Sequence, residues 1–252
     1  MFELTGKKAI ITGASSGLGV QFAIALAKQG ADVALLARRI DKLQEVKAQV
    51  EAYGVKALAI KCDVTDTANI KAAVAEVHTA FGRIDILVNN AGNAFGMPAE
   101  LQTDEDWLKV INVNLNGVFF TAREVGKIMK AQKYGKIINI GSIHSGVAMS
   151  GLPIASYCAT KGAVLMLTKE LAVEWAKFGI TVNAIGPGYF ASEMTQGMLA
   201  NEGFQKQIQV YCPMGRVGEA GELDGSLIYF ASDASRFTTG QILWVDGGWT
   251  AI

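Results

Sequence analysis

Short apolar runs alternate with longer amphipathic segments along the whole of this 252-residue chain. The runs have the length of strands and are apolar almost throughout, which is typical of strands buried on both faces of a sheet. They cover residues 7–12, 31–37, 56–61, 84–88, 136–140, 180–185 and 242–245. This alternation predicts an α/β fold: a doubly wound parallel sheet of about seven strands, flanked by helices and joined by right-handed crossovers.

The amphipathic segments predict helices between these strands. The first should end near Gln29, and later ones should cover 41–53, 66–81, 104–130, 154–177, 193–199, 204–211 and 219–231. The chain shows no linker, repeat or low-complexity stretch between them. Residues 1–252 are therefore expected to form a single domain.

Charge and composition argue against several classes of protein. Lys plus Arg and Asp plus Glu are both 23, so the chain lacks the basic excess typical of proteins that bind nucleic acids or membrane surfaces. Cys62, Cys158 and Cys212 are far apart and show no metal-type spacing, which predicts reduced thiols, no metal site and a cytoplasmic protein. No apolar run approaches membrane-spanning length, and no signal peptide is visible.

A glycine-rich turn, Thr12–Gly19 (TGASSGLG), joins the first expected strand to the first helix. Glycines at such a junction let the backbone approach a pyrophosphate, which the helix N-terminus stabilises. A turn without a ligand would have the same spacing, but its place after the first strand of an alternating chain favours a dinucleotide. The candidate cofactor-binding residues here are Gly13, Ser15, Ser16, Gly17, Leu18 and Gly19.

The end of the second expected strand indicates which dinucleotide is bound. It carries Arg38 and Arg39 and no carboxylate, and Asp32 stands at the wrong end of the strand. Because arginine binds phosphate through paired donors, this pattern favours NADP(H) over NAD(H), unless both arginines are solvated loop charges. Asp63, followed by Val64 after the third strand, could bind the adenine amino group or cap a nearby helix.

Further candidates follow later strands. Asn89–Gly92 follows the fourth strand, where open α/β sheets bind ligands, although such residues also form simple turns. Its candidate cofactor-binding residues are Asn90, Ala91 and Gly92. The expected substrate loops are 93–97, 143–154 and 189–214, which are apolar and rich in Met and therefore favour a neutral or bulky carbonyl.

Tyr157 and Lys161 stand four residues apart in an expected helix, so their side chains share one face. A nearby cation lowers a phenol pKa, which suits a general acid or base. The plainer interpretation is a packed Tyr beside a Lys that extends to solvent.

These motifs, together with Asn114, Ser142 and Pro187-Gly188, resemble the short-chain dehydrogenase/reductase family over essentially the whole chain, near its 3-oxoacyl-carrier-protein reductase and gluconate 5-dehydrogenase branches. The resemblance implies a Rossmann-like, usually homotetrameric protein that transfers hydride between a nicotinamide cofactor and a carbonyl or alcohol. It implies that Tyr157 is the general acid/base and that Lys161 binds the nicotinamide ribose and lowers the pKa of Tyr157. By the same pattern, Ser142 would bind the substrate oxygen and Asn114 would help hold a water-linked proton relay.

The resemblance also assigns the loop after the sixth strand to the nicotinamide carboxamide. The residues concerned are Pro187, Gly188, Phe190 and Ser192. We therefore expect an NADP(H)-dependent carbonyl reductase with a small-molecule substrate. An NAD-dependent sugar-acid or polyol dehydrogenase is the first alternative. A catalytically silent nucleotide-binding regulatory protein is the second, and the complete set of catalytic motifs argues against it.

Overall fold

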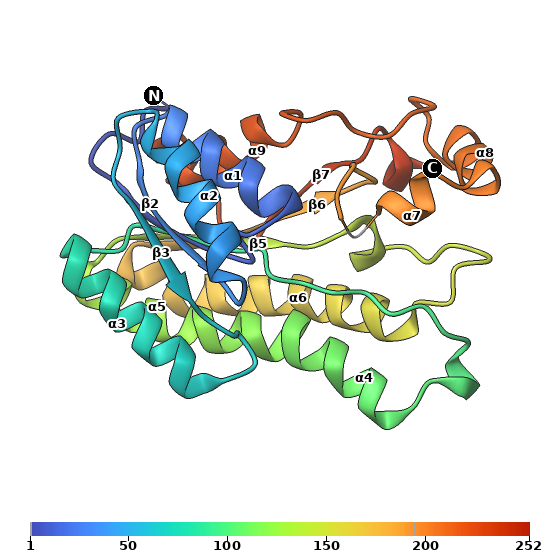
Figure 1. The fold of residues 1–252 in the computed structure, drawn as a ribbon, viewed down its shortest axis with the longest axis horizontal. Helices are drawn as coiled ribbons and strands as arrows, with labels where there is room; N and C mark the ends of the chain where they lie inside the picture. Colours follow the sequence, from blue (N-terminus) through green and yellow to red (C-terminus); the bar gives the residue numbers. More distant parts are fainter. Residues whose placement is uncertain (1, 194) are drawn as a thin grey trace.

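A computed structural model describes residues 2–193 and 195–252, and their seven strands form one parallel sheet (Figure 1). The strand order is β3-β2-β1-β4-β5-β6-β7. The predicted doubly wound α/β sheet is thus confirmed, with every strand boundary within two residues of the expected position. The strands are β1 (Lys8–Thr12), β2 (Asp32–Ala37), β3 (Ala57–Lys61), β4 (Ile86–Asn89), β5 (Gly135–Ile140), β6 (Ile180–Pro187) and β7 (Ile242–Val245).

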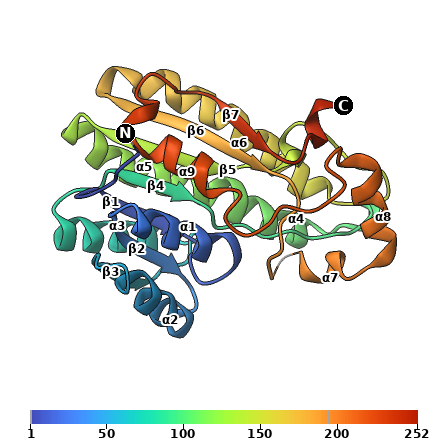
Figure 2. The same ribbon diagram turned by 90° about the horizontal axis from the view of Figure 1, so that it is seen from above.

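Helices cover both faces of this sheet (Figures 1 and 2). One face carries α1 (Gly17–Lys28), α2 (Ile40–Glu51) and α9 (Asp224–Ala231), and the other carries α3 (Thr67–Phe81), α5 (Gly117–Gln132) and α6 (Ala155–Trp175). Three further helices lie toward one end of the sheet: α4 (Asp104–Ile111), α7 (Gln196–Leu199) and α8 (Glu202–Tyr211).

Helices on both faces of the sheet explain why its strands are apolar almost throughout. In β1, Ile10 and Ile11 point to opposite faces, and each is fully buried in a different core cluster. Ile11 is in register with Leu35 of β2 and Val88 of β4, which belong to the same cluster. Burial of such side chains on both faces is the main term that stabilises the sheet.

A third, smaller apolar cluster lies beyond the sheet. It joins the segment after β5 to α8 and to the end of the chain, through Ile143, Phe204, Ile208, Cys212 and Trp249. This cluster fixes the position of the loops after β5 and β6, which were expected to contact the substrate. Met194, within the expected loop 189–214, lies outside the described residues.

Two expected helices differ most from the structure, and the one expected over 193–199 begins only at Gln196. The helix expected over 104–130 is interrupted by a π-helical turn, Asn112–Asn116, between α4 and α5. A π turn is a rare, wider turn that is frequent at functional sites. The helix expected from Glu219 begins only at Asp224, because the preceding turn is held by Glu222, which accepts from the Glu219 amide and from Arg216. Within the described residues, the structure contains no helix of the length and apolarity that a membrane span requires.

Candidate active site

Ser142, Tyr157 and Lys161 come together at the carboxyl end of β5. Ser142 follows β5, whereas Tyr157 and Lys161 lie one turn apart on α6. The Lys161 ammonium donates to the carbonyl oxygen of Ile140 at 2.7 Å and lies 5.6 Å from the centre of the Tyr157 ring. Ser142 and Lys161 are buried. The parallel sheet therefore places a hydroxyl, a phenol and an amine around one point.

Burial sets the charge states of this group. It raises the pKa of Tyr157, an effect that the hydroxyl of Ser142 partly opposes. It lowers the pKa of Lys161 to about 8. Desolvation thus leaves the pKa of Tyr157 raised overall in the protein alone, and the expected lowering by Lys161 stays a prediction.

Asn114 lies in the π turn and is fully buried. Its amide oxygen accepts from the Asn93 backbone N–H at 2.9 Å, and its amide nitrogen donates to the Asn93 carbonyl at 2.8 Å and to Thr160 Oγ1 at 3.2 Å. It thus ties the loop after β4 to the same helix that carries Tyr157 and Lys161. Its side chain is committed to these partners, and its role in a proton relay stays a prediction.

The glycine-rich turn and the segment after β4 form one unit. Asn90 donates through its side chain to the carbonyls of Thr12 and Gly13, at 3.0 and 3.2 Å. Thr12 Oγ1 in turn accepts from the backbone N–H groups of Asn90 and Ala91, both at 3.1 Å. A side chain at Gly13 would collide with Ala91 and would face a positive φ of 66°. Glycine is therefore required where these two strand ends meet.

This unit fits a dinucleotide pyrophosphate. Ser16 precedes α1 as its N-cap residue, yet its side chain makes no capping hydrogen bond there. The first backbone N–H groups of α1 are consequently open to an anion, which the helix dipole also favours. A side chain at position 19 would collide with the carbonyl of Gly13, so the site requires glycine and no side chain covers the backbone here.

The arginines at the end of β2 flank the same turn, and both are exposed. Arg39 donates to Ser15 and Ser16 of the turn and to both carboxylate oxygens of Glu193. Asp63 is not the N-cap of α3, a position that Asp66 holds. Although burial raises the pKa of Asp63, hydrogen bonds from Thr65 and the charge of Arg38 lower it overall.

The loop after β6 reaches back to the glycine-rich turn. The Gly188 N–H donates to the Val245 carbonyl at 2.9 Å, and Phe190 is buried. Ser192 lies so close to the turn that a Cβ on Gly17 would be 3.2 Å from its own Cβ. The segments predicted to bind the pyrophosphate and the nicotinamide carboxamide are thus brought together, and Val64 packs against Gly117.

Tyr189 begins the expected substrate loop 189–214, but no specific role was predicted for it. Its hydroxyl lies 3.0 Å from Nε2 of His144, whose Nδ1 lies 3.2 Å from the Val147 carbonyl. Since a carbonyl only accepts, Nδ1 carries the proton and Nε2 accepts from Tyr189; burial lowers the pKa of His144 and keeps it neutral. The His144 ring meets the Tyr157 ring edge-on, with centroids 6.1 Å apart. The position of Tyr189 directly after Pro187-Gly188 is the sequence signal from which such a role could have been predicted.

Two hollows adjoin these loops. The first, of about 460 Å³, lies between two expected substrate loops and is lined by Gly151, Leu152, Gly197, Met198, Asn201, Gly203, Phe204 and Gln207. The third expected loop, 93–97, packs against this wall through a hydrogen bond from the Met97 N–H to the Pro153 carbonyl at 2.8 Å.

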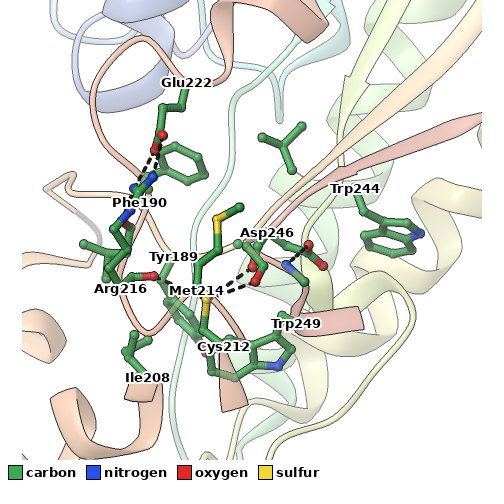
Figure 3. Close-up of a pocket in the computed structure, with 16 residues that line it drawn as sticks. Tyr189, Phe190, Ile208, Cys212, Met214, Arg216, Glu222, Trp244, Asp246 and Trp249 are labelled. Carbon is green, nitrogen blue, oxygen red and sulfur yellow. Dashed lines mark hydrogen bonds and ion pairs between the residues drawn. The ribbon is translucent and has the colours of Figure 1, made fainter. Parts of the chain in front are cut away.

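The second hollow, of about 430 Å³, is lined by Tyr189 together with Cys212, Asp246 and Trp249 (Figure 3). The Arg216–Glu222 ion pair borders it, and Ser142, Tyr157 and Lys161 are not among its lining residues. The same three residues are absent from the lining of the first hollow, which is the better candidate for the substrate because two of the expected substrate loops line it.

Comparison with known proteins agrees with this geometry. A family model described as enoyl-(acyl carrier protein) reductase, one of the short-chain dehydrogenases/reductases, matches residues 13–250. The chain belongs to the short-chain dehydrogenase/reductase family. Like other members of this family it is an oxidoreductase, as the motifs predicted.

Individual members of the family resemble the chain over its full length. It is 42% identical to gluconate 5-dehydrogenase of Gluconobacter oxydans, over 99% of this chain and 97% of that one. It is 41% identical to a sorbose reductase of Candida albicans, over 99% and 89%. Among solved structures, a gluconate 5-dehydrogenase from Burkholderia cenocepacia in complex with NADP and tartrate matches with a TM-score of 0.96 and 40% identity, over 100% and 98%.

Proposed function

We propose that this protein is an NADP(H)-dependent reductase that interconverts a ketone and a secondary alcohol on a neutral, polyhydroxylated, sugar-type substrate. The observation that carries the proposal is the convergence of Ser142, Tyr157 and Lys161 at the sheet edge onto which the glycine-rich turn also opens. The sorbose reductase relative supports a neutral sugar-type substrate, and the gluconate 5-dehydrogenase relative supports a polyhydroxylated one, although gluconate itself is an anion. The proposed homotetramer follows from the family resemblance, and the proposed cytoplasmic location follows from the three cysteines, which are expected to be reduced.

NADPH, when bound, supplies the hydride that the carbonyl carbon accepts. In the proposed reaction Tyr157 donates its proton to the carbonyl oxygen, and the Ser142 hydroxyl donates a hydrogen bond to the same oxygen. The raised pKa of Tyr157 keeps the phenol protonated before the reaction. Lys161, whose pKa of about 8 leaves it mostly charged at neutral pH, then stabilises the phenolate that forms.

The choice of NADP(H) over NAD(H) is supported by the two arginines that follow β2 and by the absence of a carboxylate from the end of that strand, Leu36–Ala37. The Burkholderia relative was solved with NADP. An NAD-dependent sugar-acid or polyol dehydrogenase is the competing assignment, and the kinetics with NADPH and NADH distinguish the two.

The substrate class is supported by the site walls. The residues that line the 460 Å³ hollow carry amides and apolar groups, and none of them is charged. Tyr189 packs against Phe204 of this wall, and with its proton donated to His144 its oxygen is an acceptor that suits a substrate hydroxyl. An acidic carrier protein is a poorer fit, because Arg123 and Lys127 already pair with Glu124, at 2.8 and 2.6 Å.

The test is an absorbance assay of NADPH consumption with ketoses, keto acids, apolar ketones, steroids and acyl thioesters. We expect turnover of a ketose and loss of turnover in Tyr157→Phe, with NADPH binding retained in a fluorescence titration. Equal turnover in Tyr157→Phe would refute the assigned acid/base. If the wild type and the variant bind NADPH equally well and the wild type turns over none of these carbonyls, the catalytically silent regulatory alternative is favoured instead.

A further inference from the structure

Arg39 and Glu193 form an ion pair between two segments that are far apart in the sequence. Arg39 follows β2, and Glu193 belongs to the loop after β6. Arg39 Nη1 and Nη2 donate to separate carboxylate oxygens of Glu193, at 3.2 and 2.9 Å. The pair is exposed, with 47% and 63% of the two side chains accessible. It therefore lies where a ligand from solvent can reach it.

The rest of the Arg39 guanidinium faces the glycine-rich turn. Its Nη2 donates to Ser16 Oγ at 2.8 Å, and its Nε and Nη2 approach Ser15 Oγ at 3.4 and 3.3 Å. A carboxylate, two serine hydroxyls and a guanidinium thus surround the side of the turn nearest the end of β2. In dinucleotide-binding folds this is the side at which the adenosine ribose lies.

The carboxylate of Glu193 holds Arg39 as a phosphate would. A fork of two N–H donors binds carboxylate and phosphate oxygens in the same bidentate way. The hydrogen bond to Arg39 is also the main cause of a lowered pKa at Glu193, which keeps the carboxylate charged at neutral pH. A 2′-phosphate that reaches Arg39 must therefore displace Glu193 or lie beside its negative charge.

We propose that Glu193 is a specificity-determining residue that competes with the cofactor 2′-phosphate for Arg39 and so reduces the preference for NADP(H) over NAD(H). The inference rests on the proposed use of NADP(H). NAD(H), which has no 2′-phosphate, leaves the Arg39–Glu193 pair in place. NADP(H) has to break it, and in doing so releases the loop after β6 from the end of β2.

The test compares dissociation constants of NADPH and NADH for the wild type and for Glu193→Gln, by fluorescence titration of the complete protein. Exposed ion pairs change an equilibrium by about two- to five-fold, so we expect the Kd of NADPH to fall by that factor. The Kd of NADH should differ by less than about 1.5-fold between the wild type and Glu193→Gln, which is smaller than the effect of losing an exposed ion pair. In an Arg39→Gln background, Glu193→Gln should have no effect on either constant.

Glu45→Gln is the matched control, because Glu45 is an exposed acid on neighbouring α2 that pairs with Lys42 at 3.0 Å. If Glu45→Gln shifts the NADPH constant as much as Glu193→Gln does, general electrostatics explain the effect and the proposal is overturned. An unchanged or raised NADPH constant in Glu193→Gln overturns it too. Failure of the proposed function shows separately, as tighter NADH than NADPH binding by the wild type.

Discussion

Lys136 is a buried lysine at the opposite end of β5 from the site, and its replacement by Met should stabilise the protein at neutral pH. It is only 2% exposed, and its Nζ donates to Ser235 Oγ at 3.3 Å. Burial lowers the pKa of Lys136 to about 8, and the positive charges of Lys7 and Arg236 act in the same direction, while Asp233 opposes them. The folded protein therefore disfavours the ammonium form.

The magnitude follows from the shift. The pKa falls from 10.5 to about 8, and each pKa unit corresponds to about 1.4 kcal/mol, so the charged form costs about 3 kcal/mol of unfolding free energy. Loss of the hydrogen bond to Ser235 reduces the gain in stability by about 1 kcal/mol. Lys136→Met should thus gain about 2 kcal/mol at pH 7.

The sign of the pH dependence is fixed by the direction of the shift. Between pH 8 and 10.5 the unfolded chain binds the Lys136 proton and the folded chain does not, so the wild type gains stability as pH rises. The advantage of Lys136→Met should therefore shrink by up to about 1.4 kcal/mol per pH unit across this window.

Urea denaturation of the wild type and Lys136→Met between pH 7 and pH 10 measures this difference directly. Lys71→Met, at an exposed position of α3, is the matched control, and its difference from the wild type should not vary with pH. A constant difference for Lys136→Met would show that Lys136 keeps its proton in the folded protein, and would refute the reasoning.

Three further predictions concern the site. Gly13→Ala should weaken NADPH binding at least about tenfold in a fluorescence titration, because its Cβ would meet Ala91 in a backbone conformation that favours glycine; unchanged affinity would contradict the proposed pyrophosphate site. Asn114→Ala should cost about 2–4 kcal/mol in urea denaturation, because it leaves the Asn93 N–H and carbonyl without their partner; a loss under about 1 kcal/mol would mean that water replaces the amide. Tyr189→Phe should raise the KM for a polyhydroxylated ketone about 3- to 10-fold, with little change for an apolar ketone, because in the proposed site it removes an acceptor for a substrate hydroxyl; an equal rise for both would assign Tyr189 to packing alone.

The sequence predicted the parts of the site that follow from strand order. Carboxyl ends of parallel strands meet at one edge, so the expected strands alone brought Gly13, Asn90 and Ser142 together. The prediction that Tyr157 and Lys161 share one face of a helix needed only the periodicity of that helix. Most of the strand and helix limits were predicted for the same reason: apolar period and length are local signals.

Contacts between distant loops could not be predicted in this way. Arg39 and Glu193 are 154 positions apart, and His144 and Tyr189 are 45 apart. Which exposed arginine meets which acid depends on loop conformation, and no periodicity encodes it. The π turn was equally hidden, because Asn112–Asn116 reads as a polar interruption of a helix until the partners of Asn114 are known. The rise that burial causes in the pKa of Tyr157 was also not predicted, since burial of the hydroxyl is a tertiary property.

The opposite shifts of Tyr157 and Lys161 have a common consequence. Burial raises one pKa and lowers the other, so it disfavours a lone phenolate and a lone ammonium alike. A phenolate and an ammonium formed side by side attract each other more strongly in the same low-dielectric site than they would in water. In the proposed reaction, proton donation by Tyr157 would thus produce a charged pair, the phenolate and the ammonium, whose mutual attraction offsets part of the cost of burying each charge. Because that attraction requires the ammonium, the group at position 161 must carry a charge, and a neutral residue of the same length would leave the phenolate uncompensated.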